Sequence, residues 1–282
     1  QIKPAIIVSV PLVAEKIIRK KILPVVQTNR MRLLLNMPVI SKKVKQKIRE
    51  QVLDVFGGKA YEMVVGGAPL NQSIETFLKS IDFPLTIAYG TTETAPLIAF
   101  SDYTEYELFS CGKIVNHMEM KINSTDPENI PGELMLGYYK NEEATREVID
   151  EDGWFHTGDL ATVSNDGHIY IKGRIKNMLL GANGQNVYPE EIEDKLNSMT
   201  MVNESLIVQH GNQLVGLVHP DMEEAQMMGF NDDDLKNIME QNRQELNTLL
   251  PPFCKISEIR IHNEEFQKTP KKSIKRYLYK IS

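Results

Sequence analysis

The sequence has little cysteine, no long apolar run and no excess of positive charge. Cys111 and Cys254 are the only cysteines among 282 residues, and no cysteine or histidine cluster has the spacing of zinc ligands. These observations exclude a recognisable zinc motif and predict two free thiols in a reducing compartment. No run of about 18 apolar residues occurs, so no membrane-spanning helix is predicted. The net charge of −6 argues against a dedicated nucleic-acid-binding protein.

The start of the chain also lacks two common features. It shows no signal peptide, and it begins with Gln1 rather than methionine, directly before a strand-like stretch. We therefore expect the sequence to start within a longer protein. Together with the low cysteine content, these features predict a cytoplasmic protein; peripheral contact with a membrane stays open, and the sequence gives no indication of oligomeric state.

The first hundred residues alternate between two hydrophobic patterns. Short β-branched and apolar runs predict strands, and apolar residues at helical spacing predict helices between them. The predicted strands cover residues 6–10, 61–65 and 85–89, and the predicted helices cover residues 12–22, 41–56 and 72–80. Strands that alternate with helices predict an α/β fold with parallel strands.

The pattern changes after about residue 101. Short strands predicted over residues 118–122, 133–136, 160–163 and 168–172 indicate a β-rich subdomain with a hairpin at Asn165-Asp166-Gly167. From residue 174 onward, helices and strands alternate again, which predicts a small separate α+β domain. We therefore expect a larger domain over residues 1–173, with its sheet in 1–100 and its β-rich part in 101–173, and a mobile domain over residues 174–282.

The sharpest local motif is Tyr89-Gly90-Thr91-Thr92-Glu93, directly after a predicted strand. At the carboxyl end of a strand, a glycine lets backbone N–H groups approach a ligand, and open α/β sheets bind their ligands at that edge. Threonine hydroxyls can donate to phosphate oxygens, and a glutamate can hold the divalent cation that neutralises them. Taken alone, the stretch also fits a simple capped turn.

Two further motifs point to a nucleotide. Gly66-Gly67-Ala68-Pro69 follows the preceding strand, where glycines let the backbone approach a ring, although a lone motif of this kind also fits a tight turn. Residues 152–160, DGWFHTGDL, end in Asp159 and Leu160. An ionised carboxylate at a strand mouth accepts hydrogen bonds from both hydroxyls of a ribose.

Four motifs in order identify a family resemblance. YGTTE at residues 89–93, DGWFHTGDL at 152–160, GRIKNM at 173–178 and GANGQNVYPEEIE at 181–193 resemble the adenylate-forming superfamily. That superfamily includes acyl-CoA synthetases, adenylation domains of peptide synthetases and firefly luciferase. The opening residues are most similar to the long-chain fatty-acid–CoA ligase branch, and the chain resembles the downstream half of such a protein.

The resemblance implies a role for each matching residue in ATP binding. It places Gly67, Ala68 and Pro69 along the adenine with Tyr89 stacked on it, and it places Gly90, Thr91 and Thr92 at the α-phosphate. Glu93 is implied as the Mg²⁺ ligand, and Asp159 as the ribose ligand with Arg174 beside it. Thr92 and Glu93 are thus candidate catalytic residues.

The resemblance also implies a second half-reaction with coenzyme A. A fatty acid would first react with ATP to give an acyl-adenylate, and the thiol of coenzyme A would then take the acyl group. Lys176 occupies the hinge position, about which the final domain rotates between the two steps. Gly181, Gly184 and Asn186 belong to the loop presented to coenzyme A.

Three departures from the family pattern matter. The Ser/Thr/Gly-rich phosphate loop is absent and is expected upstream of Gln1. Residues 131–139 are shorter than in relatives, which indicates a missing loop, with a true deletion as the alternative; residues 27–32 are suspected of a similar gap. Ser273 stands where relatives have the lysine that contacts the carboxylate and the α-phosphate.

Lys272 is the candidate replacement for that lysine, because lysine carries a compact charge on a flexible stem. The alternative is that the basic residues of this region form a solvated strand end; they are Lys268, Lys271, Lys272, Lys275 and Arg276. Two other functions stay open for the whole protein. One is an acyl-AMP ligase with a carrier protein as acceptor, and the other is an inactive nucleotide-binding fragment.

Overall fold

The computed structural model describes residues 3–22, 38–121, 129–130, 138, 140–181, 184–269 and 273–279. The chain forms two compact units, one from Gln1–Thr157 with Ala161–Ile171, the other from Gly158–Leu160 with Lys172–Ser282. Each unit has its own hydrophobic core. The domain boundary at Arg174 stays a prediction.

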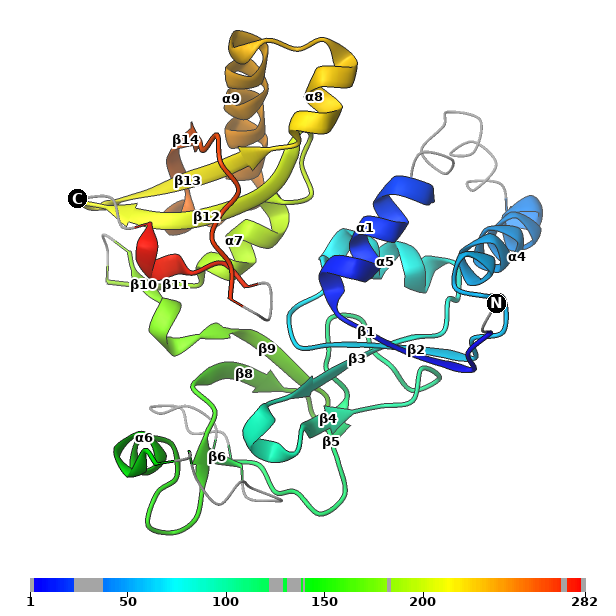
Figure 1. Ribbon diagram of the computed structural model, residues 1–282, viewed down its shortest axis with the longest axis vertical. Helices are drawn as coiled ribbons and strands as arrows, with labels where there is room; N and C mark the ends of the chain where they lie inside the picture. The colour runs from blue at the N-terminus through cyan, green and yellow to red at the C-terminus, as the bar shows by residue number, and fades with distance from the viewer. Residues whose placement is uncertain are drawn as a thin grey trace. The chain divides into compact units, whose positions relative to one another are not determined.

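The first unit is built on a five-stranded sheet (Figure 1) with strand order β1–β2–β3–β4–β5. The strands are β1 Ile6–Ser9, β2 Glu62–Gly66, β3 Leu85–Gly90, β4 Leu97–Phe100 and β5 Lys113–Ile114. β1, β2 and β3 are mutually parallel, whereas β4 and β5 are antiparallel additions. The parallel strands confirm the predicted α/β class, and β2 and β3 end at the same edge of the sheet.

Three helices supply the core of this sheet. They are α1 Pro11–Lys21, α4 Pro38–Val55 and α5 Gln72–Ser80. Ile18, Val52 and Leu78, one from each helix, are fully buried in the same cluster as Met63 of β2. The side chain of Asn71 caps α5 by accepting hydrogen bonds from the N–H groups of Ser73 and Ile74. The apolar periodicity therefore predicted these helices correctly.

The β-rich part of the first unit has shorter elements. They are β6 Asn129–Ile130, α6 Glu142–Val148, β7 Phe155–His156, β8 Asp159–Val163 and β9 Ile169–Arg174. β8 and β9 form the predicted hairpin, and residues of both strands belong to each unit.

The strand predicted over residues 118–122 is wrong for residues 118–120, which are not extended into a sheet. His117 has a φ of 71°, and the N–H of Met118 donates to the Val115 carbonyl, so the chain turns there. The strand predicted over residues 133–136 lies outside the described residues.

The second unit combines a three-stranded sheet with three helices. β12 Val202–His210 and β13 Gln213–Pro220 form an antiparallel hairpin, and β14 Ile256–Ile261 pairs with β13 in parallel. The helices are α7 Pro189–Leu196, α8 Met222–Met228 and α9 Asp232–Leu249. The alternation of helices and strands predicted after residue 174 is therefore confirmed. No described helix of either unit is long and apolar enough to cross a membrane.

Candidate functional site

Two glycine-containing loops leave the sheet of the first unit at neighbouring positions. β2 ends at Gly66 and β3 continues to Gly90, with Gly66 paired to Ala88. A Cβ on Gly66 would lie 2.9 Å from the Ala88 carbonyl oxygen, and a Cβ on Gly90 only 1.8 Å from the Pro96 carbonyl oxygen. Both positions therefore require glycine for close backbone packing. The residues predicted at the adenine, Gly67, Ala68 and Pro69, follow directly and are exposed.

The turn after β3 is fixed by Thr94. Its buried hydroxyl accepts a hydrogen bond from the Thr91 N–H at 3.3 Å and lies 3.1 Å from the Thr91 carbonyl oxygen. This closes the 3₁₀ helix η1 Thr92–Thr94 and leaves the Thr92 side chain exposed. Tyr89 and Thr91 are half-buried beside it. The arrangement provides hydroxyl and backbone donors at the sheet edge, and Thr94 is a supporting residue that the sequence did not single out.

Glu93 contacts a residue far away in the sequence. The Tyr138 hydroxyl donates to Glu93 Oε1 over 2.7 Å. Burial, and then this bond to Glu93, raise the pKa of Tyr138 to about 12, so the phenol stays a donor at neutral pH. The carboxylate is half-buried at the carboxyl edge of the sheet. A single carboxylate beside hydroxyls is the kind of oxygen set by which Mg²⁺ binds together with phosphates and water.

Asp159 and Arg174 form an ion pair at the base of the β8–β9 hairpin, within the second unit. Arg174 Nε lies 2.6 Å from Asp159 Oδ1; the Asp159 side chain is 4% exposed and the Arg174 side chain 55% exposed. The Gly158 carbonyl accepts the Ile175 N–H at 3.0 Å, which ties the two strands together at this point. The two residues predicted at the ribose are therefore neighbours, and the residues predicted at the adenine and phosphate lie in the other unit.

The predicted hinge residue Lys176 lies in the short 3₁₀ helix η2 Ile175–Asn177 and is exposed. The segment contacts the first turn of α7 through the next residue. Asn177 Nδ2 donates to Glu190 Oε1 at 2.5 Å, and a Cβ on Gly173 would lie 3.0 Å from Glu190 Oε2. Glu190 therefore connects the hinge segment to the domain that would move.

The predicted coenzyme A loop connects two short strands of the second unit, β10 Leu179–Leu180 and β11 Asn186–Val187. The Gly181 N–H donates to the Gln185 carbonyl at 2.8 Å, and the Gly184 N–H to the Gly181 carbonyl at 2.9 Å. Gly184 has a φ of 77°, a conformation that favours glycine. Asn186 is exposed, as expected for a residue that meets a ligand at the surface.

The basic segment near the end of the chain is only partly solvated. Lys268 is ion-paired with Glu204, and its side chain is 18% exposed. Arg276 Nη1 donates to both carboxylate oxygens of the buried Glu193, at 2.6 and 2.9 Å. The alternative of a wholly solvated basic strand end is therefore wrong for these two residues, because opposite charges draw them into the domain. Ser273 is exposed; Lys272 lies outside the described residues, so its predicted role stays a prediction.

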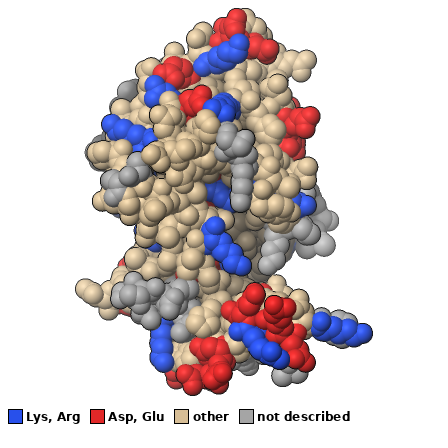
Figure 2. Space-filling view, turned by 90° about the vertical axis from the view of Figure 1, so that its left-hand side faces the viewer, with Lys and Arg blue, Asp and Glu red and all other residues tan. Residues whose placement is uncertain are grey.

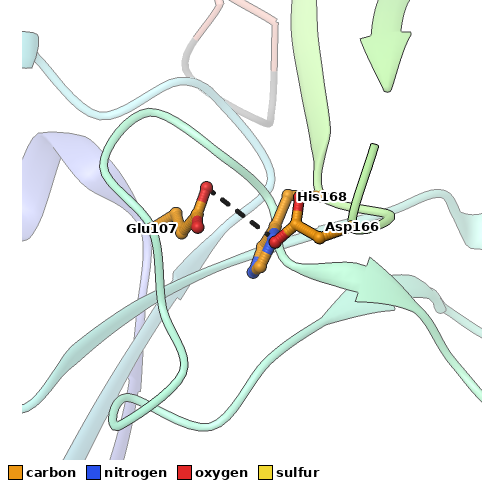
Figure 3. Close-up of side chains that lie close together, drawn as sticks. All are labelled: Glu107, Asp166 and His168. Atoms are coloured by element: carbon orange, nitrogen blue, oxygen red, sulfur yellow. Dashed lines mark hydrogen bonds and ion pairs between the residues drawn. The ribbon is translucent and has the colours of Figure 1, made fainter. Parts of the chain in front are cut away.

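A further group of ionisable residues occupies the first unit away from these motifs (Figure 3). His168 Nδ1 lies 2.8 Å from Asp166 Oδ2 and 3.7 Å from Glu107 Oε2, and its Nε2 lies 3.2 Å from the Glu105 carbonyl oxygen. The three side chains present atoms within reach of one cation. The Asp166 carboxylate and the Glu105 carbonyl lie at hydrogen-bond distance from the two ring nitrogens, so protein atoms already occupy both of them. We interpret the group as a set of polar contacts that joins the turn between β8 and β9 to the loop of residues 102–112.

Two family sequence patterns match the chain. That of the AMP-binding enzymes matches residues 1–140, and that of the AMP-binding enzyme C-terminal domain matches residues 176–280. Together they span most of the chain. Residues 152–160 and the first residues of the 173–178 motif lie between the two matched ranges.

Curated relatives share moderate identity. The chain is 35% identical over 158 residues to the long-chain-fatty-acid–CoA ligase ACSBG2 of Rattus norvegicus, which covers 54% of this chain and 23% of the relative. It is 31% identical over 179 residues to the long-chain-fatty-acid–CoA ligase FadD15 of Mycobacterium bovis, which covers 63% of this chain and 29% of the relative. The chain thus spans less than a third of the length of these relatives.

Solved structures share the fold. The adenylation domain of a carboxylate reductase from Mycobacterium chelonae matches 98% of this chain with a TM-score of 0.74 and 21% identity, over 45% of its own length. The O-succinylbenzoate coenzyme A synthetase of Bacillus subtilis, in complex with AMP, matches 99% of this chain with a TM-score of 0.68 and 18% identity, over 51% of its length. Nearly the whole of this chain therefore corresponds to about half of each of these solved structures.

Proposed function

Because the chain belongs to the AMP-binding enzyme family, we propose that the full protein activates a long-chain fatty acid with ATP and transfers the acyl group to coenzyme A. The observation that carries the proposal is the pair of glycine-containing loops at the adjoining ends of β2 and β3. Open α/β sheets bind ligands at this edge. The curated relatives named as long-chain-fatty-acid–CoA ligases support the acid as the substrate class.

In this proposal the first unit holds the adenine and the phosphates. The exposed residues Gly67, Ala68 and Pro69 leave backbone atoms open to a flat ring, and the half-buried Tyr89 offers an aromatic face. The hydroxyls of Thr91 and Thr92, with Gly90 beside them, would face the α-phosphate. Glu93 would hold the Mg²⁺ that accompanies ATP, and that cation would offset phosphate charge during attack by the fatty-acid carboxylate.

The second unit would hold the ribose and present coenzyme A. The buried Asp159 carboxyl group is paired with Arg174 at 2.6 Å, and a carboxylate so held can accept two hydroxyl hydrogen bonds. Rotation of the final domain about Lys176 would exchange one of its faces for the other between the two half-reactions, a recognised kind of hinge switching. The loop with Gly181, Gly184 and Asn186 lies on the face for coenzyme A.

The adenylation step needs a cationic side chain near the α-phosphate. Ion pairs within the second unit make two of the basic residues near the end of the chain poor candidates for this role. Lys268 and Arg276 are held by Glu204 and Glu193, so neither is available without breaking its pair. We propose Lys272 for this role, since it is adjacent to Ser273, where relatives carry the lysine. This assignment depends on the chain sequence and the family pattern.

A carrier protein as acceptor is the second candidate. The two are separated by incubating the full-length protein with ATP, Mg²⁺ and radiolabelled palmitate, and with either coenzyme A or acyl carrier protein. We expect palmitoyl-CoA. Labelled carrier protein without palmitoyl-CoA would replace the proposal with the second candidate, and neither product would reject both.

A further inference from the structure

The carboxylate of Glu93 is oriented by a tyrosine that none of the nucleotide motifs contains. We infer that Tyr138 is a positioning residue for the metal site, which fixes the orientation of the Glu93 carboxylate by a hydrogen bond to Oε1. The inference rests on the proposed function, because it concerns the cation that accompanies ATP.

The contact between the two side chains is direct and long-range. The Tyr138 hydroxyl donates to Glu93 Oε1 over 2.7 Å across 45 residues of sequence. A hydrogen bond from a fixed hydroxyl limits the rotation of the carboxylate that accepts it. Tyr138 therefore helps to hold the Glu93 carboxylate plane in one orientation.

The tyrosine backbone is itself held by the start of α6. The Tyr138 N–H donates to Thr145 Oγ1 at 2.9 Å, and the Tyr138 carbonyl accepts the Asn141 N–H at 3.1 Å. Asn141 caps α6 by accepting the Ala144 N–H at 3.1 Å, and the Thr145 hydroxyl donates back to the Asn141 carbonyl at 2.9 Å. Tyr138 is thus fixed on both sides by one short, closed set of bonds.

Helix α6 has no buried side chain, which makes an ordinary packing role for it weak. Charged side chains of both signs crowd the end of the first unit that contains α6 (Figure 2), and Arg146 pairs with Glu142 on the helix surface at 2.9 Å. None of the α6 side chains is fully buried, and the helix contributes here through the hydrogen bonds of its first turn. Its bonds reach the Tyr138 backbone, and through the tyrosine they reach Glu93.

The test compares Tyr138→Phe with Tyr170→Phe in the full-length protein. Tyr170 is a matched control, because its hydroxyl also donates to a glutamate, Glu107 Oε2 at 2.8 Å, and burial raises its pKa to about 12 as well. The readout is the binding of Mn²⁺ in the presence of AMP, followed by the electron paramagnetic resonance signal of free Mn²⁺. We expect Tyr138→Phe to weaken Mn²⁺ binding about tenfold, as for other residues that orient a metal ligand, and Tyr170→Phe to leave it unchanged.

Kinetics supply the second readout. The Mg²⁺ concentration for half-maximal ATP–pyrophosphate exchange should rise about tenfold in Tyr138→Phe, and the rate at saturating Mg²⁺ should stay near that of the wild type. If the enzyme is active and Tyr138→Phe binds the metal as tightly as Tyr170→Phe does, the inference about Tyr138 is wrong and the proposed function stands. A wild-type protein with neither Mn²⁺ binding nor exchange would overturn the proposed function, and the inference with it.

Discussion

Replacing Arg276 with methionine should destabilise the second unit strongly. Arg276 pairs with Glu193 through two hydrogen bonds of 2.6 and 2.9 Å, and the two side chains are 21% and 11% exposed. Removal of one partner from a buried pair costs about 3–5 kcal/mol, because the other charge stays buried without compensation. Since Arg276 retains some solvent contact, we expect a loss of about 3 kcal/mol in the free energy of unfolding.

The loss should depend on pH with a definite sign. Burial raises the pKa of Glu193 to about 7, although Arg276 and the Ile207 N–H act to lower it. A carboxyl whose pKa is raised on folding stabilises the fold fully below its unfolded pKa of 4.5, and this contribution is lost as pH rises through 7. Methionine removes the charge that favours the ionised form, so the pKa of Glu193 rises further. The cost of Arg276→Met should therefore be smaller at pH 5 than at pH 8.

Amide hydrogen exchange measures the loss of stability within the second unit itself. The exchange free energies of the buried residues Leu206 and Val215, on β12 and β13, report opening of the second unit as urea is varied. Glu193→Gln combined with Arg276→Met should recover part of the loss, since it leaves no unpaired charge. Arg243→Met is the control, because Arg243 is similarly exposed but pairs with Glu240, whose side chain is 51% exposed, on α9. Equal, pH-independent effects of Arg276→Met and Arg243→Met would refute the reasoning.

Three further predictions concern the proposed reaction in the full-length protein. Gly90→Ala should cost about 1–3 kcal/mol in stability and depress exchange, because the new Cβ would lie 1.8 Å from the Pro96 carbonyl oxygen; wild-type melting and exchange would contradict this. Asp159→Asn should raise the KM for ATP about tenfold, since a charged acceptor of the ribose is lost, and an unchanged KM would remove Asp159 from the site. Lys272→Ala should reduce ATP–pyrophosphate exchange strongly and spare thioester formation from preformed acyl-adenylate, with Lys271→Ala as the control. Unchanged exchange in Lys272→Ala would reject its role.

Most of the fold could be predicted from the sequence, because regular hydrophobic patterns act locally. The helical stripes that bury Ile18 and Val52, and the apolar runs of β2 and β3, specify an α/β unit before any long-range contact is known. The strand predicted near Met118 is wrong because the chain turns at His117. The hydrophobic pattern gave no signal of that turn. β4 and α8 were missed because their sequences are short and only partly buried.

Only the motifs of the candidate site, and the sheet edge at which they lie, could be predicted from the sequence. The positions of the loops after β2 and β3 follow from parallel pairing, which the alternating pattern implies. The contacts that hold the site do not, because they join residues with no local signal between them. Tyr138 reaches Glu93 across 45 residues, and Arg276 reaches Glu193 across 83. The ion pairs that draw Lys268 and Arg276 into the domain could not be predicted either, because a run of basic residues by itself favours a solvated surface.

The measurement that tests the account most directly is fatty-acid-dependent ATP–pyrophosphate exchange by the full-length protein, followed by addition of coenzyme A. The account predicts exchange that requires both palmitate and Mg²⁺, that falls in Asp159→Asn, and that gives way to palmitoyl-CoA once coenzyme A is present. Exchange that is absent, or that proceeds equally well without a fatty acid, would contradict the proposed activation of an acid at the edge formed by β2 and β3.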